Sequence, residues 1–404
     1  MDLKPGYKET SVGVIPEEWE VSSVGREFSV QLGKMLDAER NVGISKPYLG
    51  NRAVQWDRID VGELPTVPMS RTDLEKFRLQ FGDLLVCEGG EVGRAAIWNA
   101  PLEECYYQKA IHRLRPIRGF NPRLMVAILR LWSERGILAN YVTQTSIAHL
   151  PRDKFMEVPI PRPSLFEQSV IAAALSDVDS FLFGLDRLIA KKRDLKQSVM
   201  QQLLTGRTRL PGFHSDWKVK RLGEIAGIVM GQSPSSSNYN SSGDGLPLIQ
   251  GNADISNRTT IRRYFTTQIT KRGRAGDIIM SVRAPVGEVS KATFDVCLGR
   301  GVCAIRFPND FLYYSLVLME TSWSKHSKGS TFDSVNSADV RALEINLPTD
   351  SFEQTAIAAT LSDMDAELWA LEARRGKTRA LKQGMMQELL TGKTRLVRPE
   401  HEGA

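Results

Sequence analysis

The sequence predicts an α/β protein in which two α/β domains are separated by two long antiparallel coiled-coil helices, arranged as a pseudo-two-fold internal repeat. The first observation is a duplication: residues 166–210 align without a gap to residues 352–396, and 26 of these 45 positions are identical. Chance would give roughly one match in fifteen, so the chain holds two copies of one unit. The second observation is that short apolar runs interrupted by glycine and proline occupy the rest of the chain, which is typical of twisted sheets.

Each copy of the repeat predicts one long helix. The sequences Ser164-x-x-Glu167 and Asp350-x-x-Glu353 have capping-box spacing, in which a side-chain oxygen and a carboxylate satisfy the free N–H groups of the first turn. Gly206 and Gly392 supply the stop, because glycine readily adopts the left-handed conformation that closes a helix. About 40 residues lie between these signals, which corresponds to roughly 60 Å of helix.

Apolar residues in both copies alternate spacings of four and three, the pattern of a coiled-coil seam. The predicted seam, which we also expect to serve the subunit interface, comprises Ile171, Leu175, Val178, Leu182 and Leu185 in the first copy and Ile357, Leu361, Met364, Leu368 and Leu371 in the second. Charged residues interrupt it at 191–194 and 374–377, where the helices could kink, and it resumes at Leu195 and Leu381. Acidic residues crowd the first half of each copy and basic residues the second. This gradient either complements each helix dipole or favours antiparallel pairing, in which acids face bases.

The flanking regions of the two copies begin alike. Trp19 and Trp217 each precede a short segment that contains glycine, and further echoes recur at offsets that drift from 201 to 194. The helices therefore match strictly, whereas the domains between them match only in outline. We expect domains at residues 1–163 and 211–349, helices at 164–210 and 350–396, and a tail at 397–404.

Composition gives weak constraints on function. The net charge of +6 and the isoelectric point near 9.1 favour a polyanionic partner, although a mildly basic enzyme would share them. No run of 18 uninterrupted apolar residues and no signal-peptide core occur, so we expect a soluble cytoplasmic protein. Four cysteines without CxxC spacing predict free thiols and no zinc site.

The usual catalytic signatures are missing. The string Thr391-Gly392-Lys393-Thr394 resembles a phosphate-binding loop, but Gln387 occupies the position of its first glycine and the string ends a helix. Asn121-Pro122-Arg123-Leu124 is the nearest approach to a methyltransferase motif and looks like a helix start. Asp277 and Glu288 could suggest a metal nuclease, but Lys291 lies one place too far from Glu288. The sequence therefore predicts no catalytic residue and no metal ligand.

Residue types that contact DNA are better supplied. Arginine and lysine bind phosphates and guanine edges, and asparagine and glutamine bind adenine. Candidates at expected loops are Arg94, Lys109, Arg113, Gln144, Thr145, Ser146 and Arg152 in the first domain and Asn252, Arg283, Arg300, Lys328, Ser330, Thr331 and Asn336 in the second. Any one of these could be an ordinary surface side chain, so the set is stronger evidence than its members.

Several of these features together resemble a known family. They are the Gly6-Tyr7-Lys8 and Ile15-Pro16-Glu17-Glu18-Trp19 opening, the Gly-Asp-[Leu/Ile]-[Leu/Ile] strands, the Phe-Glu-Gln helix starts and the Leu-Leu-Thr-Gly-[Arg/Lys]-Thr-Arg-Leu helix ends. Nearly the whole chain is similar to the specificity subunit of type I restriction-modification systems. In that family two target-recognition domains each read one part of a split double-stranded DNA sequence, and paired helices set the gap. The resemblance implies that residues 1–163 and 211–349 are target-recognition domains 1 and 2.

The resemblance also implies partners and cofactors. Two methyltransferase subunits would bind the helical regions and carry S-adenosylmethionine, and restriction subunits would join them to translocate and cleave DNA with ATP and Mg. No cofactor is expected in this chain itself. A subunit of a methylation-only complex, a DNA nuclease or methyltransferase on an unrecognised fold, and a helical scaffold without nucleic-acid function remain as alternatives.

Overall fold

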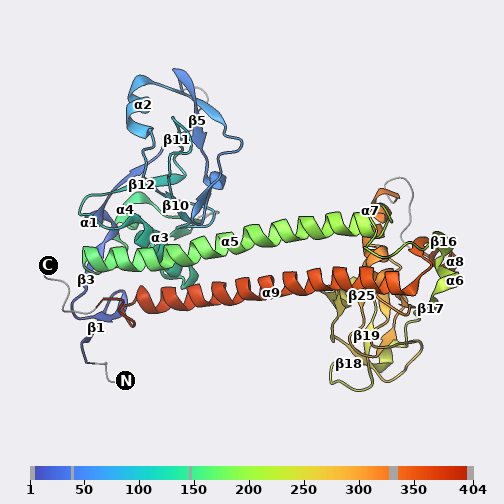
Figure 1. Ribbon diagram of the computed structural model, residues 1–404. Coiled ribbons are helices and arrows are strands. Elements are labelled where there is room, and N and C mark those ends of the chain that lie inside the picture. Colours follow the sequence, from blue (N-terminus) through green and yellow to red (C-terminus); the bar gives the residue numbers. More distant parts are fainter. Residues whose placement is uncertain (1–4, 38–40, 145–147, 327–334, 398–404) are drawn as a thin grey trace. The chain divides into compact units, whose positions relative to one another are not determined.

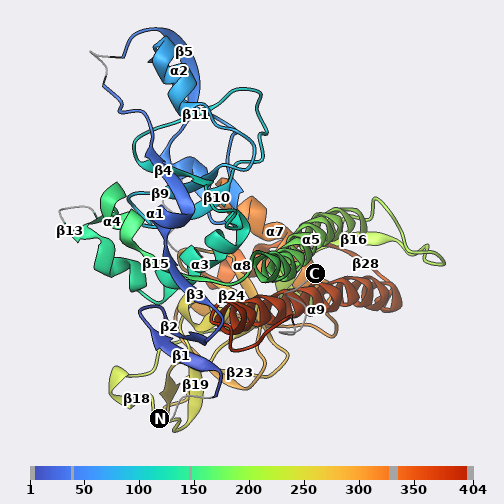
Figure 2. The same cartoon turned by 90° about the vertical axis from the view of Figure 1, so that its left-hand side faces the viewer.

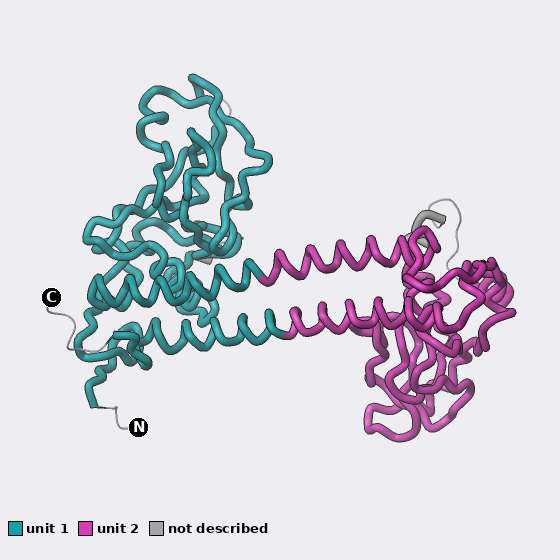
Figure 3. The backbone as a smooth tube through the Cα atoms, viewed as in Figure 1, with its two compact units in different colours: residues 1–184, 374–404 teal, residues 185–373 magenta. Residues whose placement is uncertain are grey.

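Two compact units make up the computed structural model, which describes residues 5–37, 41–144, 148–326 and 335–397. Unit 1 contains residues 1–184 and 374–404, and unit 2 contains residues 185–373 (Figure 3). Each unit therefore combines one α/β region with one stretch of each long helix.

Unit 1 is built around the buried strand β9 (Leu84–Cys87), the second strand of an antiparallel sheet with the order β10-β9-β12-β4. Successive β9 side chains point to opposite faces, as strand geometry requires. Leu84 and Val86 belong to the core beneath helix α3, whereas Leu85 and Cys87 belong to a second core that includes residues of the three-stranded sheet β11-β5-β8. Both faces of the sheet are buried, which explains why the strand reads as one continuous apolar run.

The elements of unit 1 before the long helices are β1 Tyr7–Thr10, β2 Gly13–Pro16, β3 Glu20–Ser23, α1 Val24–Glu27, β4 Phe28–Leu32, β5 Ile44–Leu49, β6 Val54–Gln55, β7 Arg58–Ile59, β8 Thr66–Met69, α2 Arg71–Phe77, β9 Leu84–Cys87, β10 Ala95–Ile97, β11 Tyr106–Tyr107, β12 Ile111–Pro116, α3 Pro122–Glu134, β13 Thr143–Gln144, β14 Ala148–His149, α4 Arg152–Glu157 and β15 Pro159–Arg162.

Unit 2 repeats this plan around strand β24 (Ile278–Ser281), which lies in a sheet of order β17-β27-β24-β25-β21-β20. Ile278 and Met280 join the core beneath helix α7, and Ile279 joins a second core with β19 and β26 of the five-stranded sheet β18-β22-β19-β26-β23. Its elements are β16 Trp217–Arg221, α6 Leu222–Ile225, β17 Gly227–Met230, β18 Tyr239–Asn240, β19 Leu246–Ile249, β20 Ile255–Ser256, β21 Thr259–Thr260, β22 Phe265–Thr266, β23 Arg272–Gly273, β24 Ile278–Ser281, β25 Val289–Lys291, β26 Val296–Leu298, β27 Val302–Arg306, α7 Phe311–His326, α8 Ser337–Ala342 and β28 Glu344–Pro348.

A helix and a hairpin occupy corresponding places in the two units. Helix α3 begins at an asparagine cap, because the Asn121 side chain accepts the N–H of Arg123 at 2.9 Å and Pro122 needs no partner. The two-residue hairpin β6–β7 in unit 1 and β20–β21 in unit 2 place Asp57 and Arg258 at their tips with φ of 60° and 63°. Tight hairpin turns require this left-handed conformation.

The repeated segments form helices α5 (Leu165–Leu203) and α9 (Ser351–Leu389), each of 39 residues and continuous through its charged interruption (Figure 1). Gly206 and Gly392 follow the helix ends with φ of 72° and 67°, as the sequence predicted. Within each unit the two helices pack side by side, and the view along them in Figure 2 shows the same pairing.

The predicted seam positions before the charged interruption are shielded from solvent, whereas the first apolar residue after it is exposed in each helix. All ten predicted seam residues are buried or half-buried, and Ile171 and Leu175 also join the core of their recognition region. Leu195 and Leu381, predicted to resume the seam, are instead 47% and 60% exposed. The neighbouring lysines Lys196 and Lys382 turn inward in their place. The next apolar positions, Val199 and Leu203 of α5 and Met385 and Leu389 of α9, are buried or half-buried, so the departure is local.

The predicted capping box forms only in part. The Ser164 hydroxyl accepts the N–H of Glu167 at 3.3 Å, and the Asp350 carboxylate accepts that of Phe352 at 2.8 Å. The carboxylates of Glu167 and Glu353 do not return to the helix start. They are fully buried and bind groups from other parts of their units instead.

Helix α5 has a stretch of 18 residues with a mean hydropathy of 1.2, which by length and composition alone would allow a membrane span. Only 28% of that stretch is buried in the structure, and one helix of this kind is weak evidence for a membrane protein.

Candidate functional site

Three loops meet at one edge of the main sheet in each unit. In unit 1, backbone hydrogen bonds join Leu150 to Glu88 at 2.8 Å and Glu88 to Ala110 at 2.9 Å. In unit 2, Val335 bonds to Val282 and Val282 to Gly301, both at 2.9 Å. We call these regions the first and second loop junctions. The first comprises residues 88–94, 108–110 and 148–150, and the second comprises 281–288, 299–301 and 335–336. Five of the DNA-binding candidates lie in these loops: Arg94, Lys109, Arg283, Arg300 and Asn336. Arg113 lies in strand β12 instead.

The candidates of the first loop junction differ in accessibility. Lys109 is exposed, whereas the Arg94 side chain is 14% exposed and donates to the Asn51 carbonyl at 2.9 Å. Arg113 is buried, donates to Gln31 and to the Lys76 carbonyl, and lies 5.7 Å from the Tyr107 ring centroid. Arg113 therefore holds elements of unit 1 together in this structure.

Two further candidates of unit 1, Gln144 and Arg152, lie within the described residues. Arg152 begins α4, is exposed, and donates from Nε to the Val30 carbonyl at 2.9 Å. Gln144 ends strand β13. Thr145 and Ser146 lie outside the described residues.

The second loop junction carries three exposed candidates, Arg283, Arg300 and Asn336. A further candidate, Asn252, lies outside its loops and is half-buried at the start of a short 3-10 turn. The Asn336 side chain caps α8 by accepting the N–H groups of Ala338 and Asp339 at 2.8 and 3.1 Å. Lys328, Ser330 and Thr331 lie outside the described residues.

The acid Glu88 sits among the basic candidates of the first loop junction. Burial raises the pKa of the half-buried Glu88 carboxyl, and the charges of His149 and Lys109 offset part of this rise. Among the described groups of this junction, the Glu88 carboxyl is the one whose pKa is raised. Burial also raises the pKa of the neighbouring Cys87 thiol. Neutralising the Glu88 carboxyl at lower pH would leave the junction more positive.

Ion pairs show that the long helices run antiparallel. In unit 2, Lys192 of α5 contacts Glu367 of α9 at 2.6 Å and Arg193 contacts Glu372. Lys196, further along α5, pairs with Asp365, which lies earlier in α9. From Arg193 to Lys196 on α5 the partner on α9 falls from Glu372 to Asp365, so the helices run in opposite directions. Basic ends meet acidic beginnings, as the charge gradient predicted.

A buried carboxylate ties each helix start to the segment that follows the other long helix. Glu167 accepts hydrogen bonds from Trp19 at 2.9 Å and from Arg395 at 2.9 Å. Sequence reasoning assigned Glu167 to capping and missed this role. The signal was present, because Arg395 is itself one of the positions identical between the two copies.

Among the described residues, no group of three or more histidine, cysteine, aspartate or glutamate side chains could hold a metal ion. The four cysteines are buried and unpaired by disulfides, as their spacing predicted. Burial raises the pKa of Cys105 and Cys303 to about 12, so these thiols stay protonated.

Comparison with known proteins decides the family. The model of the type I restriction modification DNA specificity domain matches residues 16–192 and 214–381, one match for each half of the chain. The chain belongs to this family. The two matches begin near the start of each α/β region and extend into the following long helix, so the family unit includes both parts.

Individual relatives agree over nearly the full length. A protein of Methanocaldococcus jannaschii assigned as the MjaX specificity subunit of a type I restriction enzyme is 29% identical over 413 residues, covering 96% of this chain and 97% of the relative. A chain from a structural study of complex assembly and conformational transition of the type I R-M system superposes with a TM-score of 0.63 at 25% identity, covering 94% and 99% of the two chains. The HsdS subunit from Thermoanaerobacter tengcongensis superposes with a TM-score of 0.50 at 25% identity, covering 94% and 98%.

These findings confirm the family, the fold class and the general function expected from the sequence. The specificity subunit has two α/β recognition regions with long helices packed together, and its role is to specify DNA, not to catalyse.

Proposed function

We propose that this specificity subunit reads a bipartite double-stranded DNA target, with one loop junction on each half of the sequence. The observation that carries the proposal is the contrast between the halves. The long helices match at 26 of 45 positions, whereas the loop junctions share their backbone connections and differ in side chains. A retained scaffold that carries two dissimilar surfaces is what two different half-sites require.

The division of labour along the chain follows from this reading. Residues 1–163 and 211–349 act as the two target-recognition domains, and residues 164–210 and 350–396 act as spacer helices that dock partner subunits. The tail of residues 397–404 falls almost wholly outside the described part of the chain.

Exposure supports a ranking of the DNA contacts. Lys109, Arg283 and Arg300 are exposed without a side-chain ion pair within the described structure, so they are free to meet phosphates or guanine edges. Asn252 carries the amide group that pairs with adenine edges. Arg113 and Asn336 shape the loops from within, because their polar atoms already bind protein groups.

Partners supply the chemistry in this proposal. The chain joins two methyltransferase subunits, which carry S-adenosylmethionine, in the cytoplasm. Restriction subunits that use ATP and Mg bind the same assembly. The similar chain whose study concerns complex assembly of the type I R-M system supports an assembled form. A methylation-only complex would show site-specific methylation without ATP-dependent cleavage.

The test is to supply this chain to its methyltransferase subunits and sequence the methylated DNA. The expected result is one asymmetric bipartite motif with a fixed gap, and no methylation or cleavage by the homogeneous chain alone. Methylation without sequence preference, or turnover by the isolated chain that one point change abolishes, would refute the proposal.

A further inference from the structure

The duplication repeats a small polar cluster on the helix pair. In unit 1 the cluster consists of Ser176 and Asp179 of α5 with Lys382 of α9, and the Lys382 ammonium lies 2.6 Å from the Asp179 carboxylate. In unit 2 the equivalent residues, 186 positions away, are Ser362 and Asp365 of α9 and Lys196 of α5. Lys196 and Asp365 form the ion pair there. We call these the first and second sockets. Both border a cavity beside the α/β region, of about 210 Å³ in unit 1 and about 750 Å³ in unit 2.

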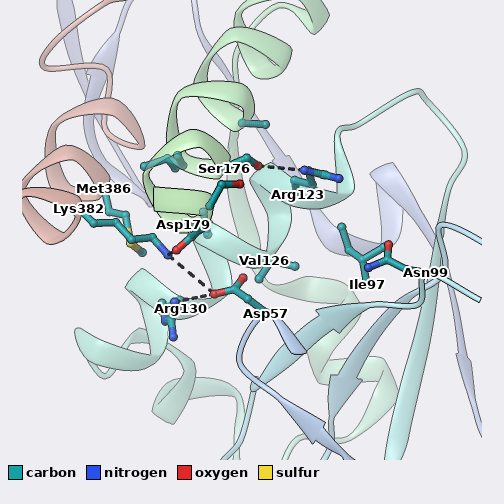
Figure 4. Close-up of a pocket in the computed structure, with 14 residues that line it drawn as sticks. Asp57, Ile97, Asn99, Arg123, Val126, Arg130, Ser176, Asp179, Lys382 and Met386 are labelled. Carbon is teal, nitrogen blue, oxygen red and sulfur yellow. Dashed lines mark hydrogen bonds and ion pairs between the residues drawn. The ribbon is translucent and has the colours of Figure 1, made fainter. Parts of the chain in front are cut away.

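The first socket receives a carboxylate and a guanidinium from the recognition region (Figure 4). Asp57, at the tip of the β6–β7 hairpin, lies 3.8 Å from the Lys382 ammonium and 2.7 Å from Arg130 of α3. Arg123 of α3 donates to the Ser176 hydroxyl at 3.1 Å. Lys382 thus lies between a carboxylate of the helix pair and a carboxylate of the recognition region.

The second socket receives a different side chain. The Tyr314 hydroxyl of α7 donates to the Asp365 carboxylate at 2.9 Å, and the Tyr314 ring centroid lies 5.4 Å from the Lys196 ammonium. One residue therefore engages both charges of the second socket. The same Ser-Asp-Lys cluster is therefore contacted by a carboxylate and a guanidinium in unit 1 and by a phenol in unit 2.

The hairpin-to-helix contact beside each socket is also reversed in charge. In unit 1 the hairpin tip supplies the acid Asp57 and α3 supplies the base Arg130. In unit 2 the hairpin tip supplies the base Arg258 and α7 supplies the acid Glu320. The helices present the same residues in both units, whereas each recognition region presents a different complement to them.

We propose that the sockets are positioning sites that set the angle of each recognition region against the helix pair, and thereby set which gap between half-sites is accepted. This inference rests on the proposed function. Apolar packing of Ile171 and Leu175 in unit 1, and of Ile357 and Leu361 in unit 2, already holds each region to the helices. Apolar contact is non-directional, whereas charged hydrogen bonds prefer defined distances and angles. The socket residues supply the directional part of the attachment.

The experiment uses the full chain in complex with its methyltransferase subunits. DNA substrates carry the mapped half-sites with the native gap or with one base pair added or removed. Tyr314→Phe removes the hydroxyl that binds Asp365, and Asp57→Asn removes the charge at Lys382 while keeping a residue type that tolerates positive φ. We expect each variant to keep both half-site sequences and to lose about tenfold in discrimination between the native and altered gaps, the effect of one charged hydrogen bond.

Matched controls come from neighbouring positions. Tyr313→Phe removes the same hydroxyl from the adjacent residue of α7, and Lys191→Ala and Lys377→Ala remove exposed lysines that are themselves equivalent in the two helices. Lys196→Ala and Lys382→Ala should widen the accepted gaps, whereas the controls should not.

A charge exchange separates positioning from simple helix pairing. Lys196→Asp combined with Asp365→Lys keeps attraction between the helices but removes the acceptor for Tyr314. Under the proposal gap discrimination stays lost in this variant, and its full recovery would overturn the proposal. Unchanged discrimination in Tyr314→Phe would also overturn it, even where the lysine variants do not assemble. Loss of sequence-specific methylation by the unmodified chain would instead refute the proposed function.

Discussion

Arg209 donates to the buried carboxylate of Glu353 at 2.6 Å, and Arg395 donates to the buried carboxylate of Glu167 at 2.9 Å in the other unit. The two pairs are equivalent, because Arg395 lies 186 positions after Arg209 and Glu353 lies 186 positions after Glu167. Each arginine belongs to the segment that follows one long helix, and each glutamate begins the other. The pairs therefore close the open ends of the helix pair with a charged bond inside each unit.

Arg209→Ala should destabilise the chain by about 2 kcal/mol at neutral pH, less than for a fully buried pair because Arg209 is 29% exposed. Burial acts to raise the pKa of Glu353, but the bonds from Arg209 and Ser215 outweigh it and lower the pKa. A lowered pKa gives stability that is present above the unfolded value and is lost as pH falls through the folded value. Denaturant unfolding should therefore show a difference at pH 7 that shrinks below about pH 4.5. Arg207→Ala, an exposed neighbour, is the control, and equal stabilities would contradict the assignment.

The helices and the pairing direction were predictable because apolar spacing and charge order act locally along the chain. The sockets were not, because Lys196 and Lys382 read as surface charges in a helical pattern, whereas in the structure they also contact Tyr314 and Asp57. Those partners come from segments distant in sequence, and no periodicity predicts which side chain of a variable region will meet a helix. The identity of both lysines and both aspartates across the two copies was the available signal.

The loop junctions were predictable in residue type and only partly in accessibility. Arg113 and Lys109 are both basic residues near one turn, yet one is buried over Tyr107 and the other is exposed. Strand β12 places alternate side chains on opposite faces, and the sequence did not reveal that Arg113 faces Gln31 of the adjacent strand β4.

Lys109→Ala and Arg283→Ala should each change DNA binding by the assembled complex in one of two ways. When a residue binds a phosphate, one counterion is released from the DNA. Removing that residue therefore makes the negative slope of log affinity against log salt shallower by about 0.9. A residue that reads a base edge relaxes one position of the methylated motif instead. Arg71→Ala, on the exposed face of α2, should do neither. Absence of both effects in both variants would show that the loop junctions do not face DNA.

Deleting about seven residues at equivalent positions of α5 and α9 should shorten the helix pair by roughly 10 Å, or about three base pairs. The antiparallel register requires equal deletions, because removal from one helix alone would misalign ion pairs such as Lys192–Glu367. Sequencing of methylated sites should show a changed or abolished gap with both half-sites retained. The original gap in a folded double deletion would exclude the helices as the ruler.

Acid should weaken unit 1 through His112. Burial lowers the pKa of this fully buried imidazole to about 4, with a smaller contribution from the charge of Arg152, while its bond to the Leu150 carbonyl opposes the shift. The unfolded chain protonates His112 near pH 6.5 and the folded chain does not, so stability falls as pH drops from about 6.5 to about 4. The loss should reach about 3 kcal/mol.

Unfolding curves of His112→Gln should be flatter than wild type over this pH interval, since glutamine cannot gain a proton but can still donate to the Leu150 carbonyl. The exposed His214→Gln serves as the comparison. Parallel pH profiles for wild type and His112→Gln would contradict the neutral buried state.

A fragment of residues 1–211 should form an antiparallel homodimer, because a second copy can replace what unit 1 loses. Unit 1 takes Met386, Leu389 and Leu390 of α9 into its core. Their equivalents at offset 186 are Met200, Leu203 and Leu204 of α5, which the second copy would present to the same surface. Arg395, which binds Glu167, would be replaced by Arg209 of the second copy. Lys382, which binds Asp179, would be replaced by Lys196.

The dimer would carry two copies of the first recognition domain, so its methylated motif should become an inverted repeat of the half-site read by residues 1–163. The helix contact that differs most in the dimer is the one at Phe181. In the full chain the Arg374 guanidinium carbon lies 5.0 Å from the Phe181 ring centroid, and in the dimer Leu188 would take the place of Arg374. That exchange loses a cation–π contact and gains an apolar one, so association should survive it. The measurements are the fragment's mass in solution and the sites methylated in its presence. A monomer, or a dimer that still directs methylation to an asymmetric sequence, would show that the two halves are not interchangeable.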